Sequence, residues 1–297
     1  MQMSARDWML LLALSLLWGG SFFFTAVAVR EVPLLTLVLC RVGIAAVALA
    51  LYLRVRGAAL PLTGPAVGAF FGMGLLNNLI PFSLLFWAQT EIASGLASIV
   101  NATTPIFSML VAHFMLADER MAPNKVAGVL FGIGGVAVLI GGNALGGVDA
   151  STLGIVACLG AALSYGFASV FGRRFRTMGI PPDAGALGQL TATTVMMIPI
   201  ALIADRPWTL PMPGTAALLA TLGLALAATA LAYLIYFRLL ATAGAVNAVL
   251  VTLLIPPSAI LLGTLILGEV LEGRHLIGMA LIGVGLVAVD GRVFRKR

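Results

Sequence analysis

The residues of this chain that could do chemistry are a few polar side chains inside long apolar stretches. Arg41 stands within the stretch 34–53, Asn77 and Asn78 within 57–90, and Asn101 within 92–117. A polar group in a lipid bilayer finds no water to bond, and a charged group there is costly, so each of these residues needs a partner. The partner is either a neighbouring helix or a polar solute that passes through the protein, and the sequence leaves both interpretations open.

Helical spacing places several of these polar residues on common faces. One face carries Asn77, Asn78, Pro81 and Phe82. A second stripe, at three-and-four spacing, comprises Asn101, Thr104, Pro105 and Ser108. A neutral, partly aromatic cavity lined by such residues suits a zwitterion with an apolar side chain.

Aromatic residues on other apolar stretches would extend the wall of that cavity, although each of them could equally be a packing residue. With the polar stripes they give the expected substrate-binding residues: Trp18, Phe22, Asn77, Asn78, Pro81, Phe82, Asn101, Thr104, Tyr165 and Tyr233. Tyr236 adds further aromatic surface near Tyr233. These residues come from five different stretches, so a bundle of helices must bring them around one centre.

Arg41 is the one basic residue well inside an apolar stretch. It lies eight residues from the start of its stretch, which is roughly 10 Å along a helix. Its long side chain either reaches back to the membrane surface or faces the cavity and meets a substrate carboxylate. Its depth fits both alternatives.

The composition indicates which type of secondary structure positions these residues. Only 28 of 297 residues are charged, which is 9%, and 61% are apolar, whereas a soluble domain carries about 25% charged residues. The apolar runs are continuous and long enough for membrane-spanning helices, which excludes a transmembrane barrel. We predict an all-α integral membrane protein with ten spans: 8–29, 34–53, 57–90, 92–117, 126–148, 150–172, 184–204, 207–237, 239–268 and 275–289.

The basic residues predict the orientation of these spans. If the amino terminus is inside, cytoplasmic segments carry 13 of the 17 Lys and Arg residues, the opposite segments carry 3, and Arg41 lies within a span. This asymmetry favours cytoplasmic termini, because basic residues are enriched on the cytoplasmic side of membrane proteins. It also explains the net charge of +6 without a nucleic-acid partner.

The two halves of the chain resemble each other at an offset of 150 residues. Glu119, Gly128 and Gly135 recur as Glu269, Gly278 and Gly285. Each repeat, 1–146 and 147–297, holds five spans, and an odd number makes the second repeat inverted in the membrane relative to the first. Such pairs surround the central site of many transporters.

Two prolines fall in near-equivalent places of the two repeats. Pro105 and Pro256 correspond with a shift of one residue. Proline interrupts the hydrogen-bond ladder of a helix, so each is a candidate hinge, with a static kink as the alternative.

Several motifs together resemble a known family. They are Leu17-Trp18-Gly19-Gly20-Ser21-Phe22, Asn101-Ala102-Thr103-Thr104-Pro105, and Glu119 followed by a glycine-rich span. Nearly the whole chain is similar to the EamA-type exporters of the drug/metabolite transporter superfamily, and within them to bacterial exporters of aromatic amino acids. The resemblance implies a ten-helix bundle around a central cavity, an inner-membrane location, and export of amino acids or related metabolites.

Other classes of function fit the residues less well. No catalytic motif or metal-ligand spacing is present, Cys40 and Cys158 stand alone in apolar stretches, and we expect no enzyme activity, metal or cofactor. No Asp or Glu lies in the middle of a span, which favours facilitated diffusion by alternating access over proton coupling and over transport of drug cations. A multidrug exporter and a channel remain the alternatives. A monomer suffices for this function, and the oligomeric state is open.

Overall fold

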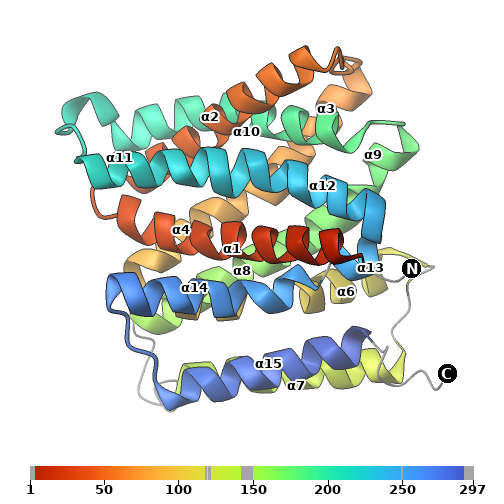
Figure 1. Ribbon diagram of the computed structural model, residues 1–297, viewed down its shortest axis with the longest axis vertical. Coiled ribbons are helices and arrows are strands. Elements are labelled where there is room, and N and C mark those ends of the chain that lie inside the picture. Colours follow the sequence, from red (N-terminus) through yellow and green to blue (C-terminus); the bar gives the residue numbers. More distant parts are fainter. Residues whose placement is uncertain (1–3, 118, 120–121, 142–149, 249, 291–297) are drawn as a thin grey trace.

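The computed structural model describes residues 4–117, 119, 122–141, 150–248 and 250–290. In this part of the chain the regular elements are helices, and the prediction of an all-α membrane protein is confirmed. Eight helical segments are long and apolar enough to cross a membrane, and two shorter apolar helices complete the set of ten. The segments lie side by side (Figure 1). We call the face where α1 begins the amino-terminal face, and the face where it ends the opposite face.

The first five spans have the following bounds. The first and second are α1 (Ala5–Ala28) and α2 (Leu34–Val55). The third combines α3 (Gly64–Gly74), η1 (Leu75–Leu79) and α4 (Ile80–Glu91). The fourth combines α5 (Ser94–Asn101) and α6 (Thr104–Met115), and the fifth is α7 (Pro123–Ile140).

The second five spans repeat this order. The sixth is α8 (Ala150–Phe171), followed by the short α9 (Arg173–Thr177), and the seventh is α10 (Pro182–Asp205). After the turn η3 (Pro207–Thr209), the eighth combines α11 (Thr215–Leu222), η4 (Gly223–Leu231) and α12 (Ala232–Ala243). The ninth combines α13 (Ala245–Ala248) and α14 (Val251–Leu267), and the tenth is α15 (Gly273–Asp290).

The eighth span differs at both ends from the charge-free stretch 207–237. It begins at Thr215, because three prolines in 207–213 deny the backbone the donors that a helix needs. It continues past Arg238 to Ala243 and ends at Gly244, whose φ of +82° suits glycine. Arg238 does not end the helix because its side chain is exposed and can reach water.

Helices α7 and α15 pack against each other in opposite directions and form one edge of the molecule (Figure 1). A Cβ on Gly135 would lie 2.8 Å from the carbonyl oxygen of Gly278, and one on Gly285 would lie 2.7 Å from that of Gly128. The 150-residue offset turns one of these pairs into the other. The two helices are therefore related by a two-fold axis between them, as inverted repeats require. The predicted boundary between the repeats, 146/147, lies outside the described residues.

The third and eighth spans, which occupy equivalent places in the two repeats, both contain π-helical turns. These turns are η1 and η4, where the backbone bonds five residues back instead of four. Single π turns inside α-helices occur often at functional sites, because they rearrange side chains and free backbone groups. Both turns fall near the middle of their spans.

Candidate substrate site

Arg41 lies inside the bundle and not at the membrane surface. Its side chain is buried on α2, and its Nε donates a hydrogen bond to Thr229 Oγ1 of η4 at 3.0 Å. The guanidinium carbon is 3.7 Å from the ring centroid of Phe82 and 5.7 Å from that of Phe86, both on α4. A cation over an aromatic face is attracted by the ring. The guanidinium of the second span is therefore held by rings of the third span and by a hydroxyl of the eighth.

The charge of Arg41 has no acidic partner within the part of the chain that the structure describes. The ion pairs found there join Arg173 to Glu119 and Arg274 to Glu272, both near the ends of spans. A hydroxyl and an aromatic face compensate a buried cation only partly. An anionic group that reached Arg41 would therefore gain a strong charge-assisted interaction.

A network of neutral polar side chains joins the third, seventh and eighth spans. Asn77 Nδ2 donates to Gln189 Oε1 at 3.1 Å and lies 3.5 Å from the hydroxyl of Tyr233. Asn78 Nδ2 donates to Thr193 Oγ1 at 3.1 Å, and the Tyr233 hydroxyl donates to Asn78 Oδ1 at 3.3 Å. Tyr233 thus touches both asparagines from the other half of the protein.

The π turn η1 and Pro81 together place the asparagines. In the π pattern the amide of residue 81 would bond the carbonyl of Leu76, but proline has no N–H to give. The hydroxyl of Ser164 on α8 donates to that carbonyl instead, at 2.7 Å. Ser164 is followed directly by Tyr165, so this bond also fixes α8 against the network.

Tyr165 and Tyr233 both lie within electrostatic range of the Arg41 charge. Phe82 is buried and stacks on Phe86 at an interplanar angle of 9°. Its ring lies directly against the Arg41 guanidinium. Tyr233 therefore relates the two groups of residues: it interacts electrostatically with Arg41 and shares hydrogen bonds with the asparagines. Polar and aromatic surface from five spans therefore meets in one region.

The other predicted residues make different contacts in the structure. Trp18 contacts Tyr236, with ring centroids 5.5 Å apart, and Phe22 is buried in the core. Thr104 Oγ1 donates to the carbonyl of Asn101 at the break between α5 and α6. The Asn101 Oδ1 is buried and has no hydrogen-bond partner among the described residues. None of these four shares a described hydrogen bond with the network.

The two candidate hinges have different surroundings. Pro105 lies in the first turn of α6, directly after the break at Ala102 and Thr103, so the fourth span is interrupted there. Pro256 lies inside α14, which continues through it. In the ninth span, α13 ends at Ala248 and α14 begins at Val251.

Sequence reasoning missed three residues of the site: Gln189, Thr193 and Thr229. Gln189 and Thr193 are four residues apart on α10, and both are buried. A glutamine within a predominantly apolar span is a signal that could have found the pair. Thr229 gave no such signal, because threonines also bond their own helix, as Thr229 does to the carbonyl of Leu224 at 2.8 Å.

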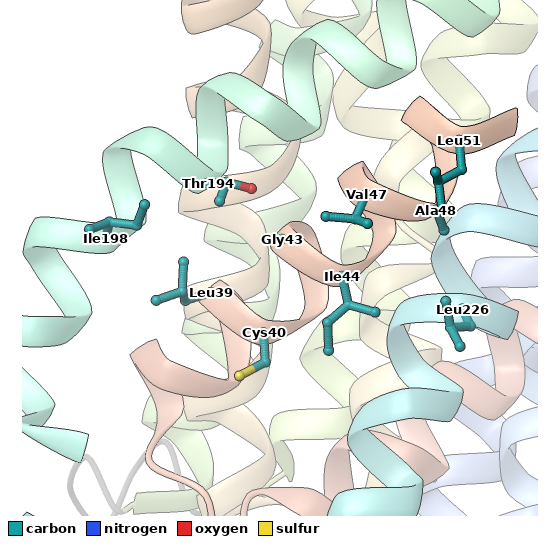
Figure 2. A pocket seen from close by; sticks show the side chains of 10 residues that line it. All are labelled: Leu39, Cys40, Gly43, Ile44, Val47, Ala48, Leu51, Thr194, Ile198 and Leu226. Carbon is teal, nitrogen blue, oxygen red and sulfur yellow. The ribbon is translucent and has the colours of Figure 1, made fainter. Parts of the chain in front are cut away.

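An apolar groove of about 490 Å³ lies on the outside of the bundle (Figure 2). Side chains of α2, α10 and η4 line it, among them Cys40, Ile44, Thr194 and Leu226. Its wall offers almost no polar group, so it suits lipid chains and not a zwitterion. The polar network lies elsewhere.

Ten apolar helices in two inverted halves, with a buried cation and a polar network between them, define a multi-pass membrane transporter. The chain belongs to the EamA-like transporter family, whose model matches residues 7–141 and again residues 152–289. The resemblance predicted from the motifs is thereby confirmed at the family level. Family membership also makes the chain a transporter and not an enzyme.

Individual relatives agree with this assignment. The uncharacterized inner membrane transporter YedA of Escherichia coli (strain K12) is 29% identical over 86% of this chain and 80% of its own length. A probable amino-acid metabolite efflux pump of the same strain is 28% identical over 62% of this chain and 59% of its own length. A solved crystal structure with 23% identity covers 98% of both chains with a TM-score of 0.68, which shows a common fold.

Proposed function

We propose that this transporter exports small amphipathic metabolites, namely amino acids including aromatic ones, and that Arg41 binds their carboxylate. The observation that carries the proposal is the buried guanidinium on Phe82 with no acidic partner among the described residues. A zwitterion would bring the missing negative charge. The similarity to a protein named as a probable amino-acid metabolite efflux pump supports the same substrate class.

The ammonium group and side chain of such a substrate have matching partners close by. Asn78 Oδ1 and Gln189 Oε1 already accept hydrogen bonds in the network, and each is an acceptor that an ammonium group could use. The rings of Tyr165 and Tyr233 offer aromatic surface to an apolar side chain. Trp18, Phe22, Pro81, Asn101 and Thr104 are proposed to line the path to this site.

Transport proceeds by alternating access, with each half of the protein rocking against the other and with Pro105 and Pro256 as hinges. Among the described residues, the site contains a fixed positive charge and no carboxylate that could carry a proton. The carrier therefore works by facilitated diffusion, and the substrate gradient sets the direction. The termini lie in the cytoplasm and the protein resides in the inner membrane, so the amino-terminal face is the cytoplasmic one.

A liposome experiment tests this proposal. Purified protein is reconstituted and the uptake of a panel of radiolabelled solutes is measured without an imposed proton gradient. Neutral amino acids should pass, and uptake should saturate and show counterflow. Passage of sugars or hydrophobic cations with failure of every amino acid would contradict the substrate class, and uptake without saturation or counterflow would indicate a channel.

A further inference from the structure

One glutamate of the second half ties it to the first half at the opposite face. Glu269, in the connection between α14 and α15, accepts hydrogen bonds from the backbone amides of Ser94 at 2.8 Å and Gly95 at 3.1 Å. These are the first two residues of α5, where the fourth span begins. A carboxylate at the start of a helix is favoured both by the free amides and by the helix dipole.

Two glycines next to the Glu269 carboxylate leave the space that it occupies. The Glu269 amide donates to the carbonyl of Gly263 at 3.0 Å, which turns the chain back over α14. A side chain at Gly263 would occupy the position of the Glu269 carboxylate, and one at Gly95 would press on Ile260 of α14 at 3.2 Å. Two glycines therefore allow α5, α14 and Glu269 to close together.

The counterpart of Glu269 in the first half is not engaged in this way. The 150-residue offset relates Glu269 to Glu119, and Ser94 and Gly95 to Gly244 and Ala245, where the ninth span begins at the amino-terminal face. The Glu119 side chain is 46% exposed, and its carboxylate lies 3.6 Å from Arg173.

The packing of the spans shows the same difference between the faces. At the opposite face α5 packs against α14. At the amino-terminal face α6 has no comparable packing against α13 or α14 among the described residues. Two pairs of elements that the repeat makes equivalent therefore pack differently at the two faces in the described part of the chain.

We propose that Glu269 and Glu119 are alternating latches of the transport cycle, which extends the alternating access of the proposed function to named residues. The Glu269 latch, formed with Ser94 and Gly95, closes the opposite face. The Glu119 latch, formed with the start of the ninth span at residues 244–245, closes the amino-terminal face in the other state. The conformation described here has the first latch closed and the second open, so it faces the amino-terminal side.

Hydrogen exchange in lipid nanodiscs tests the latches without a transported substrate. The two test variants are Glu269→Gln and Glu119→Gln, which keep size and remove charge. Glu272→Gln is the control, because Glu272 lies in the same connection as Glu269 and pairs with Arg274 at 2.7 Å. Its hydrogen bond with Arg274 lowers the pKa of the Glu272 carboxyl, so the control also removes one negative charge at neutral pH.

The expected result is reciprocal. Glu269→Gln should raise amide exchange in 94–101 by about tenfold, the equivalent of one lost charged cap, and should slow exchange in 244–252. Glu119→Gln should slow exchange in 94–101, and Glu272→Gln should change neither segment. A rise confined to 94–101 in Glu269→Gln, with 244–252 unchanged, would reduce Glu269 to a static cap and overturn the proposal.

A crosslink provides a second readout if Glu269→Gln fails to fold. The double substitution Gly95→Cys with Ile260→Cys places two thiols where the latch closes. Oxidation should stop substrate flux and reduction should restore it. Unchanged flux in the fully crosslinked protein would also overturn the latch, whereas failure of amino acids as substrates would affect only the proposed function.

Discussion

The guanidinium carbon of Arg41 lies 3.7 Å above the ring of Phe82, in the interior of the bundle. The two residues come from the second and third spans of the first half, and the bond from Arg41 to Thr229 adds the eighth span from the second half. A charge held between the halves is placed where a central site of an inverted-repeat transporter is expected. The predictions below start from this relationship.

Replacement of Arg41 should weaken transport by removing the carboxylate contact. A hydrogen bond to a charged group contributes about 1.5–3 kcal/mol, so Arg41→Gln should raise the half-saturating concentration for amino acids roughly 10- to 100-fold. Arg41→Lys should retain part of the affinity, because it keeps the charge without the planar fork. Liposome uptake over a range of concentrations measures this, with the exposed Arg30→Gln as control. Equal affinity in all three variants would remove Arg41 from the site.

Thr229 should position Arg41. Thr229→Val keeps the shape and removes the oxygen that accepts the Arg41 N–H, at a cost of about 1–3 kcal/mol for the unmet donor. We expect weaker binding of amino acids, with little change for Thr229→Ser. The readout is the half-saturating concentration compared with the melting temperature, since a purely structural role would lower stability and leave affinity unchanged.

Gln189 should matter although it is far from Arg41 in sequence. Gln189→Leu leaves Asn77 without its 3.1 Å acceptor in a buried region, and we expect lower transport with a folded protein. Gln189→Glu would add a negative charge to a network whose described side chains are neutral, and this charge should suppress carboxylate binding further. Uptake assays on the two variants measure this effect, and size-exclusion profiles check that both fold. Normal transport by both variants would contradict a role of Gln189 in the site.

Two neighbouring glycines on α1 should respond differently to alanine. A Cβ on Gly19 would lie 2.6 Å from the Cβ of Ser258 on α14, whereas one on Gly20 would find its nearest atoms at 3.8 Å. Close backbone approach at small residues stabilises membrane helix pairs, so Gly19→Ala should lower the melting temperature and Gly20→Ala should not. The same shift in both variants would mean that α1 and α14 are farther apart than described.

The sequence predicted much of this architecture because its signals are long and physical. The ten apolar runs predict the number of spans. The matching residues 150 apart predict the antiparallel packing seen between Gly135 and Gly278. The bounds of the eighth span could not be predicted from charge alone. Prolines delay its start, and exposure of Arg238 lets it continue.

The site was harder to predict, because the depth of a residue in a span does not determine the direction in which its side chain points. Arg41 at its depth could reach the surface, and only the packing of α4 and η4 draws it inward. Asn77 and Asn78 stood out as polar residues, but their partners Gln189 and Thr193 belong to a span whose rotation the sequence leaves free. Asn101 and Thr104 formed an equally clear stripe, but they share no described hydrogen bond with the network.

Arg41 is proposed to recognise the carboxylate of an amino acid. The most direct test is competition in liposomes, where uptake of radiolabelled phenylalanine is challenged with phenylalanine, with 3-phenylpropionate and with phenethylamine. We expect the two carboxylates to compete in the wild-type protein and the amine not to compete, and we expect Arg41→Gln to lose this discrimination. Competition by phenethylamine as strong as that by phenylalanine would contradict it.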